Sequence, residues 1–179
     1  MTPQEFFARA VPAAVAGGHI FPEYAVCEAA EESGWGSSEL TLQARNLFGL
    51  KQGKCTAGYP CIELPTHEWE NGKLVPAQAT WPVFPTWAEA FAVRMKVLEA
   101  LAPEFPHYAA ALAAPDGPHF VIEVSQTWST DPNRAANVLL IHANHAGLIR
   151  NLLAAAEASE ALPFRRPAAP APSAQETKK

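Results

Sequence analysis

Long apolar runs, blocks of one charge and abundant cysteine are all missing from this 179-residue sequence. No apolar stretch reaches the roughly 20 residues that a transmembrane helix needs. The 13 basic residues stand against 18 acidic ones, which gives a net charge of −5, and neither sign gathers into a long block. The chain therefore lacks the basic signature of a protein that binds nucleic acid or an anionic membrane. We expect neither as a partner, and we expect a monomer.

The three cysteines are too few for a disulfide scaffold. Cys27 falls within a helical pattern and is expected to be a small buried apolar residue. Cys55 and Cys61 bracket a tight loop, TAGYP, where a local disulfide would fit in an oxidising compartment. A zinc site built from these two and His67 matches no strong ligand spacing. We therefore expect no metal and no cofactor.

We do not expect the Ala/Val-rich start of the chain to be a secretory signal. Glu5 precedes the first cation, Arg9, and Pro12 interrupts the apolar segment, so there is no basic leader region. Thr2 and Glu5 instead form a capping-box pattern, with proline at the first helical position. We expect synthesis in the cytoplasm without a signal peptide.

The remaining pattern predicts one mainly helical α+β domain over residues 1–160. Its β-lobe, about 52–85, has two arms, 61–70 and 73–84, around the hairpin signal Asn71-Gly72. Prolines at 65, 76 and 82 confine these arms to sheet edges. A Pro/Ala-rich tail, 161–179, is expected to be disordered. The apolar periodicity and capping residues predict helices over 2–16, 22–32, 38–45, 88–101, 106–113, 116–128 and about 132–158.

Two adjacent glutamates end the second predicted helix, in the segment EESGWGSS. On a helical wheel Glu31 lies almost opposite the alanine face, as a solvated charge would. Glu32 lies at the edge of that face, flanked by Ala25 and Ala29, at the negative end of the helix dipole. Partial burial and the dipole both disfavour the ionised carboxyl, which suits a general acid. The residues alone fit an ordinary capped helix end equally well.

The glycines that follow allow a sharp turn and leave space for a bulky ligand beside Glu32. Trp35, between Gly34 and Gly36, offers a flat apolar face of the kind on which sugars stack. This combination points towards carbohydrate chemistry.

The segment AAEESGWGSSELTLQARNLFGLK resembles the signature of the bacterial glucosaminidase domain, glycoside hydrolase family 73. That family includes autolysins, flagellar peptidoglycan hydrolases and phage endolysins. The resemblance continues through THEWENG (66–72), TWAEAF (86–91) and STDPNRAANVL (129–139), and it covers nearly all of residues 5–155. It implies a lysozyme-like α-domain with a β-lobe and cleavage of a β-1,4 bond in peptidoglycan, most simply by an endo-β-N-acetylglucosaminidase.

The resemblance also implies the catalytic pair. Glu32 matches the general acid of the family, and Glu68 falls where the flagellar members carry their second glutamate. Glu63 and Glu70 are the other carboxylates of the β-insertion. A Glu68-bound water would invert the anomeric centre, and help from the N-acetyl group of the substrate is the alternative. A solvated charge near a hairpin turn remains the structural alternative for Glu68.

The same matched motifs predict a set of substrate-binding residues, namely Trp35, Asn46, Phe48, Trp128 and Asp131. Trp128 stands where the family has tyrosine, so an aromatic surface is kept and the phenol is lost. Glu31 replaces an apolar residue before the catalytic glutamate. These departures bear on bond preference and rate rather than on the reaction class.

Three hypotheses follow from the sequence. The first is the glucosaminidase, the second a muramidase or lytic transglycosylase on the same fold, and the third a non-catalytic module that binds glycan or a partner. An enzyme without a signal peptide would reach the periplasm or cell wall after lysis, as an endolysin does, or by non-classical secretion. A secreted antibacterial effector would imply an immunity protein as a further partner.

Overall fold

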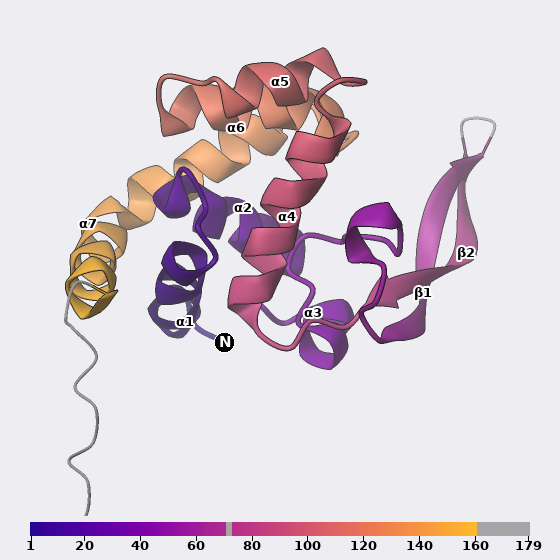
Figure 1. The fold of residues 1–179 in the computed structure, drawn as a ribbon, viewed down its shortest axis with the longest axis horizontal. Coiled ribbons are helices and arrows are strands. Elements are labelled where there is room, and N and C mark those ends of the chain that lie inside the picture. The colour runs from indigo at the N-terminus through magenta and orange to yellow at the C-terminus, as the bar shows by residue number, and fades with distance from the viewer. Residues whose placement is uncertain (71–72, 161–179) are drawn as a thin grey trace, which may run out of the picture.

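A computed structural model describes residues 1–70 and 73–160, so the predicted turn at 71–72 and the tail at 161–179 lie outside the described residues. The described chain is mainly helical, with one antiparallel hairpin inserted between the third and fourth α-helices (Figure 1). This confirms the predicted α+β class. The elements are α1 (Pro3–Ala16), α2 (Pro22–Ser33), α3 (Glu39–Ala44), the 3-10 turn η1 (Lys54–Thr56), β1 (Cys61–Glu70), β2 (Lys73–Pro82), α4 (Trp87–Leu101), α5 (Pro106–Leu112), α6 (Gly117–Trp128) and α7 (Arg134–Glu160).

The sequence positions the helix ends by local hydrogen bonds. Thr2 and Glu5 form the predicted capping box of α1, and the Thr86 hydroxyl accepts from the Glu89 N–H at 3.1 Å at the start of α4. The predicted start of the last helix was two residues early. Asp131 accepts from the Asn133 N–H at 2.9 Å and so closes a turn before α7 begins at Arg134.

The hairpin projects from the helical body (Figure 1). Its register runs from the pair Cys61–Pro82 to the pair Glu70–Lys73, and with only two strands both have a free edge. The prolines therefore lie on edge strands, as predicted. The second arm was predicted to reach Phe84, but β2 ends at Pro82 because Phe84 turns into the core and donates its N–H to the Ala44 carbonyl at 2.9 Å.

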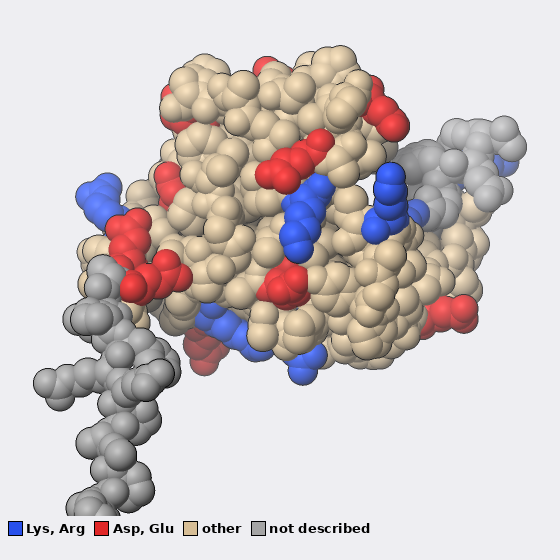
Figure 2. Space-filling view, in the orientation of Figure 1, with Lys and Arg blue, Asp and Glu red and all other residues tan. Residues whose placement is uncertain are grey.

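The core forms where α1, α2, α4 and α7 pack together, with α5 and α6 paired against them (Figure 1). Its largest fully buried aromatic side chains are Phe6, Phe7, Phe48, Phe84, Phe91 and Phe120. Cys27 is buried, as predicted, and Cys55 and Cys61 are free thiols. None of the described helices is long and apolar enough to cross a membrane. Acidic and basic side chains are scattered over the face in Figure 2.

Two glycines test how tightly the helices pack. A Cβ on Gly17 would lie 2.6 Å from the Ala88 carbonyl oxygen, whereas one on Gly147, within α7, meets nothing within 4 Å. We expect Gly17→Ala to lower the free energy of unfolding by about 1–3 kcal/mol, since the backbone at Gly17 or at Ala88 would have to move to make room for the Cβ. Gly147→Ala should raise it by about 0.5–1 kcal/mol through helix propensity. Urea denaturation measures the change in the free energy of unfolding for each variant. Equal changes in the two variants would contradict the close packing of α1 on α4.

Candidate active site

A buried cluster of charges lies between α2, α4 and α7. Its centre is the carboxylate of Glu28, which is fully buried together with Arg94, while Arg134 is 2% exposed. Glu28 Oε1 accepts from Arg94 Nη2 at 2.7 Å and from Arg134 Nη2 at 3.0 Å. Hydrogen-bonded pairing of this kind is what allows charges to remain in a protein interior.

Glu32 lies one helical turn after Glu28 and is the partly exposed end of this cluster. Its side chain is 23% exposed, and Oε1 accepts from Arg134 Nε at 2.7 Å. Gly34 adopts the left-handed conformation, with φ 56°, and ends the helix directly after Glu32 and Ser33. The Ser33 hydroxyl then accepts from the Gly36 N–H at 2.8 Å, which fixes the turn. The Glu32 carboxylate therefore lies at the C-terminal end of α2, where these contacts fix the backbone conformation.

The guanidinium of Arg134 is held on three sides. Nε donates to Glu32, Nη1 donates to the Ser125 hydroxyl at 2.9 Å, and Nη2 donates to Glu28. Burial opposes the charge on Arg134, but the two carboxylates outweigh it and raise the pKa of the guanidinium. Arg134 is thus a fixed cation beside Glu32.

Arg94 continues the cluster away from Glu32. Its guanidinium lies over the Phe48 ring at 4.6 Å and the Trp128 ring at 5.0 Å, and Nη1 is 3.1 Å from Nε2 of His19. Burial, and then the charge of Arg94, hold the pKa of His19 well below its ordinary value. A neutral His19 accepts from Arg94 through Nε2, because a guanidinium can only donate. The contacts therefore run in one series: His19 to Arg94, Arg94 to Glu28, Glu28 to Arg134, and Arg134 to Glu32.

Glu31 was predicted to be a solvated charge opposite the alanine face of α2, and the solvated part of this prediction is wrong because the residue is half-buried. Its Oε1 accepts from Asn137 Nδ2 of α7 at 2.9 Å. Helix α7 packs along α2, so the side of α2 opposite the alanines also has a partner. Both glutamates of the pair therefore face α7, and they differ in partner: an amide for Glu31 and a guanidinium for Glu32.

Two of the predicted substrate-binding residues are buried. Asn46 is 1% exposed, donates to the Leu50 carbonyl at 2.7 Å and accepts from the Leu50 N–H at 3.0 Å. Phe48, at 2% exposed, supports Arg94 and packs against Phe91. The structure therefore gives both residues a role in shaping the loop, and their direct contact with a sugar stays a prediction.

The other predicted binding residues are more accessible. Trp35 is half-buried, and its ring packs on Phe6, Phe7 and His145. Trp128 is also half-buried beside Arg94, and Asp131 is exposed before α7. Trp128 and Asp131 both precede Arg134 at the start of α7, so of the predicted binding residues these two lie nearest in sequence to the partner of Glu32. Sugar stacking on Trp35 stays a prediction.

Glu68 lies on the hairpin, in register with Val75 of β2. Because the hairpin projects from the helices, the second carboxylate of the predicted pair comes from a different part of the fold than Glu32 (Figure 1). Its role as a base is a prediction that the fold leaves open.

A groove of about 590 Å³ runs between the loop after Asn46 and the last turns of α4. Its lining combines apolar side chains with charged ones, and the residues are Leu50, Lys51, Gly53, Lys54, Cys55, Thr56, Val97, Ala100, Leu101 and Glu104. Val97 and Leu101 follow Arg94 by one and two turns of α4, so the same helix contributes to the groove and to the charged cluster. A groove of this size and composition suits a small ligand or a segment of a glycan.

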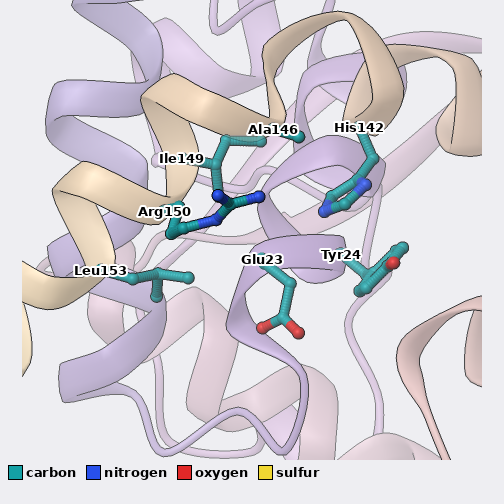
Figure 3. A pocket seen from close by; sticks show the side chains of 7 residues that line it. All are labelled: Glu23, Tyr24, His142, Ala146, Ile149, Arg150 and Leu153. Atoms are coloured by element: carbon teal, nitrogen blue, oxygen red, sulfur yellow. The ribbon is translucent and has the colours of Figure 1, made fainter.

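A smaller cavity of about 240 Å³ lies between the first turn of α2 and α7 (Figure 3). Tyr24 stacks on His142 there, with the ring centroids 4.2 Å apart. Tyr24 and Glu32 are eight residues apart on α2, or about 12 Å along its axis. The cavity is therefore separate from the charged cluster.

Comparison with known proteins places the chain in a family. Residues 9–146 match the glucosaminidase family, described as mannosyl-glycoprotein endo-beta-N-acetylglucosaminidase. The chain belongs to this family. Glu28, Glu32, Arg94 and Arg134 all lie within the matched residues.

Relatives with a curated name are similar over most of the domain. The peptidoglycan hydrolase FlgJ of Salmonella typhimurium is 30% identical over 115 residues, which is 62% of this chain and 35% of that protein. A probable N-acetylmuramidase of Lactococcus lactis is 31% identical over 140 residues, 73% of this chain and 30% of that protein. The chain thus spans about a third of the length of the curated relatives it matches.

Solved structures show the same fold. A C-terminally truncated glycoside hydrolase domain of Salmonella typhimurium FlgJ superposes with a TM-score of 0.60 at 25% identity, covering 80% of this chain and 97% of that one. The catalytic domain of the autolysin Auto from Listeria monocytogenes gives a TM-score of 0.69 at 22% identity, covering 84% and 89%. The fold of this glucosaminidase-family chain is therefore lysozyme-like, as the sequence resemblance implied.

Sequence reasoning missed Glu28, Arg94 and Arg134. A signal was present for two of them, because Glu28 falls four residues before Glu32 beside the alanine face, and Arg94 interrupts the apolar stripe of AEAFAVRMKVLEAL. A charge within an apolar stripe indicates a buried pair. Arg134 had no such signal, since its partners lie far away in the chain.

The buried pairing predicts a large cost for losing Glu28. Glu28→Gln leaves Arg94 without a carboxylate in the interior, and we expect a loss of about 3–5 kcal/mol in the free energy of unfolding. The control is Glu123→Gln, which breaks the partly exposed ion pair with His107 and should cost about 0–1 kcal/mol. Chemical denaturation of both variants at pH 7 measures the difference, and equal losses would contradict a buried cluster.

Burial of neutral His19 predicts a pH dependence of stability. Below the ordinary pKa of 6.5 the unfolded chain takes up a proton at His19 that the folded chain refuses, so stability falls as the pH falls. His19→Gln should reduce this slope between pH 6.5 and 5 by up to about 1.4 kcal/mol per pH unit. The control is His107→Gln, at an exposed histidine. Urea unfolding at several pH values in this range measures how the free energy of unfolding depends on pH. The same dependence in wild type and His19→Gln would refute the prediction.

Proposed function

We propose that this chain hydrolyses β-1,4 glycosidic bonds in the glycan strands of peptidoglycan, as an endo-β-N-acetylglucosaminidase. The observation that carries the proposal is the placement of Glu32, a partly exposed carboxylate on a fixed buried cluster, within the matched glucosaminidase segment. The names of curated relatives support the substrate, since they include a peptidoglycan hydrolase and an exo-glucosaminidase. Residues 1–160 would form the catalytic domain, with the β-lobe at about 52–85.

In the proposed reaction Glu32 donates a proton to the glycosidic oxygen as the bond breaks. Glu68 activates a water that attacks the anomeric carbon from the opposite face, and the product anomer is inverted. The groove beside α4 holds the neighbouring sugars, and Trp35, Asn46, Phe48, Trp128 and Asp131 shape or line the binding site. If the N-acetyl group of the substrate replaces Glu68, the product keeps its configuration.

A second bond preference has its own support. The Lactococcus lactis relative is named a probable N-acetylmuramidase, so the neighbouring β-1,4 bond is the rival target. A lytic transglycosylase, which needs a single carboxyl group, would not depend on Glu68. A non-catalytic glycan-binding module would release no product at all.

We further propose that the chain acts in the periplasm or cell wall. Release at lysis, as for an endolysin, and non-classical secretion are the two routes that we propose. The substrate would be the only partner of an endolysin, whereas a secreted effector would also bind an immunity protein in the producing cell. A holin gene or an immunity gene beside the coding sequence would distinguish the two.

The decisive variant is Glu32→Gln, which keeps the shape of the side chain and removes its proton. We expect the rate of glycan cleavage on purified peptidoglycan to fall by about 10²–10⁴-fold. The matched control is Glu31→Gln, which should stay within a few-fold of wild type because Glu31 bonds to Asn137 instead. A Glu32→Gln enzyme with full activity would overturn the assignment.

Mass spectrometry of the released fragments identifies the bond in the same experiment. N-acetylglucosamine at the new reducing ends supports the proposal, N-acetylmuramic acid supports a muramidase, and anhydro ends support a transglycosylase. If the wild-type protein released no fragments, the result would support the hypothesis of a non-catalytic glycan-binding module. Activity retained by Glu68→Gln would exclude Glu68 as the base and favour the N-acetyl route.

A further inference from the structure

We infer that Arg134 is a positioning residue for the general acid. It orients Glu32 through Oε1, so that Oε2 is the oxygen that presents the proton to the substrate. This inference rests on the proposed function, because it assigns a part of the same site. It concerns a residue outside the catalytic pair.

The first argument is geometric. Each of the three nitrogens of the Arg134 guanidinium donates to a different side chain: Glu32 and Glu28 on α2 and Ser125 on α6. A planar group with three separate partners has one orientation, whereas a single ion pair could rotate. The Nε that contacts Glu32 is therefore held by the other two hydrogen bonds.

The second argument is the balance of charge. Glu28 already has Arg94 at 2.7 Å, so the buried carboxylate is compensated without Arg134. The charge of Arg134 is needed for the second carboxylate, Glu32, at 2.7 Å. The Arg134 guanidinium thus compensates the charge of the partly exposed Glu32, while its hydrogen bond to the buried Glu28 holds it in place.

The third argument concerns the two oxygens of Glu32. Within the described residues, its hydrogen bonding goes to Oε1, and the side chain is 23% exposed. A proton on Oε1 would have to share that oxygen with an N–H donor at hydrogen-bonding distance, so Oε2 is the better carrier. Fixing one oxygen and presenting the other is the preorganisation that proton transfer to a glycosidic oxygen requires.

The charged groups around Glu32 come from three helices. They are Arg134 from α7, Glu28 and Glu31 from α2, and, through Glu28, Arg94 from α4. Of these, Arg134 contacts the Glu32 carboxylate, through Oε1 at 2.7 Å. Its removal should therefore free the carboxylate from one orientation, and the rate of proton transfer should fall.

The test compares Arg134→Lys and Arg134→Gln with wild type, using soluble peptidoglycan fragments. Lysine keeps the charge, but its three N–H donors lie on one nitrogen and cannot reproduce the planar fork of arginine, whereas glutamine loses both charge and geometry. We expect kcat to fall about 10–100-fold in both variants, with KM changed less than about three-fold. A fall in kcat at constant KM is the readout that a merely structural role would not produce.

The matched control is Arg150→Gln, which removes the same charge from an exposed position of α7 and should leave both kcat and KM unchanged. Thermal unfolding is measured for every variant. A purely structural role would lower the melting temperature of Arg134→Gln while the folded enzyme kept its kcat, and that result overturns the inference. If wild type cleaves nothing, the proposed function fails; if wild type is active and Arg134→Gln matches it, only the role of Arg134 fails.

Discussion

One buried carboxylate joins the helices on which the site depends. Glu28 accepts hydrogen bonds from Arg94 of α4 and Arg134 of α7, residues that lie 66 and 106 positions away in the chain. An unpaired charge at this depth would be costly, so α2, α4 and α7 must come together in one arrangement. The aromatic rings around Arg94 then exclude water from the pair. Packing and electrostatics therefore impose the same geometry.

This arrangement explains how a short helix can present the proposed general acid. In the proposed reaction Glu32 has to meet water and substrate in a fixed direction. The left-handed Gly34 ends α2 directly beyond it, and Arg134 holds the carboxylate from α7. The carboxylate is thus partly exposed while its support is buried, which separates the demands of stability from those of the proposed chemistry. The groove beside α4 begins within two turns of the same cluster.

The sequence predicted the elements well because their ends are local. The capping box at Thr2, the N-cap at Thr86, Gly34 after α2 and the alternating arms of the hairpin all depend on residues a few positions apart. The Glu31 error and the missed Arg134 have one cause: both depend on α7 folding back over α2, about 100 residues later in the chain. The family motif could point to Glu32 because its neighbours are in one segment. It could not show which cation faces that glutamate.

The prolines of the hairpin have a consequence for how the protein behaves among copies of itself. A two-stranded sheet leaves both outer edges open, and an open edge is a template for a strand from another molecule. Proline has no N–H, so each of Pro65, Pro76 and Pro82 removes a donor from the ladder that such an intruder would need. The lobe that projects furthest from the helices is thereby the one least suited to seed a fibril.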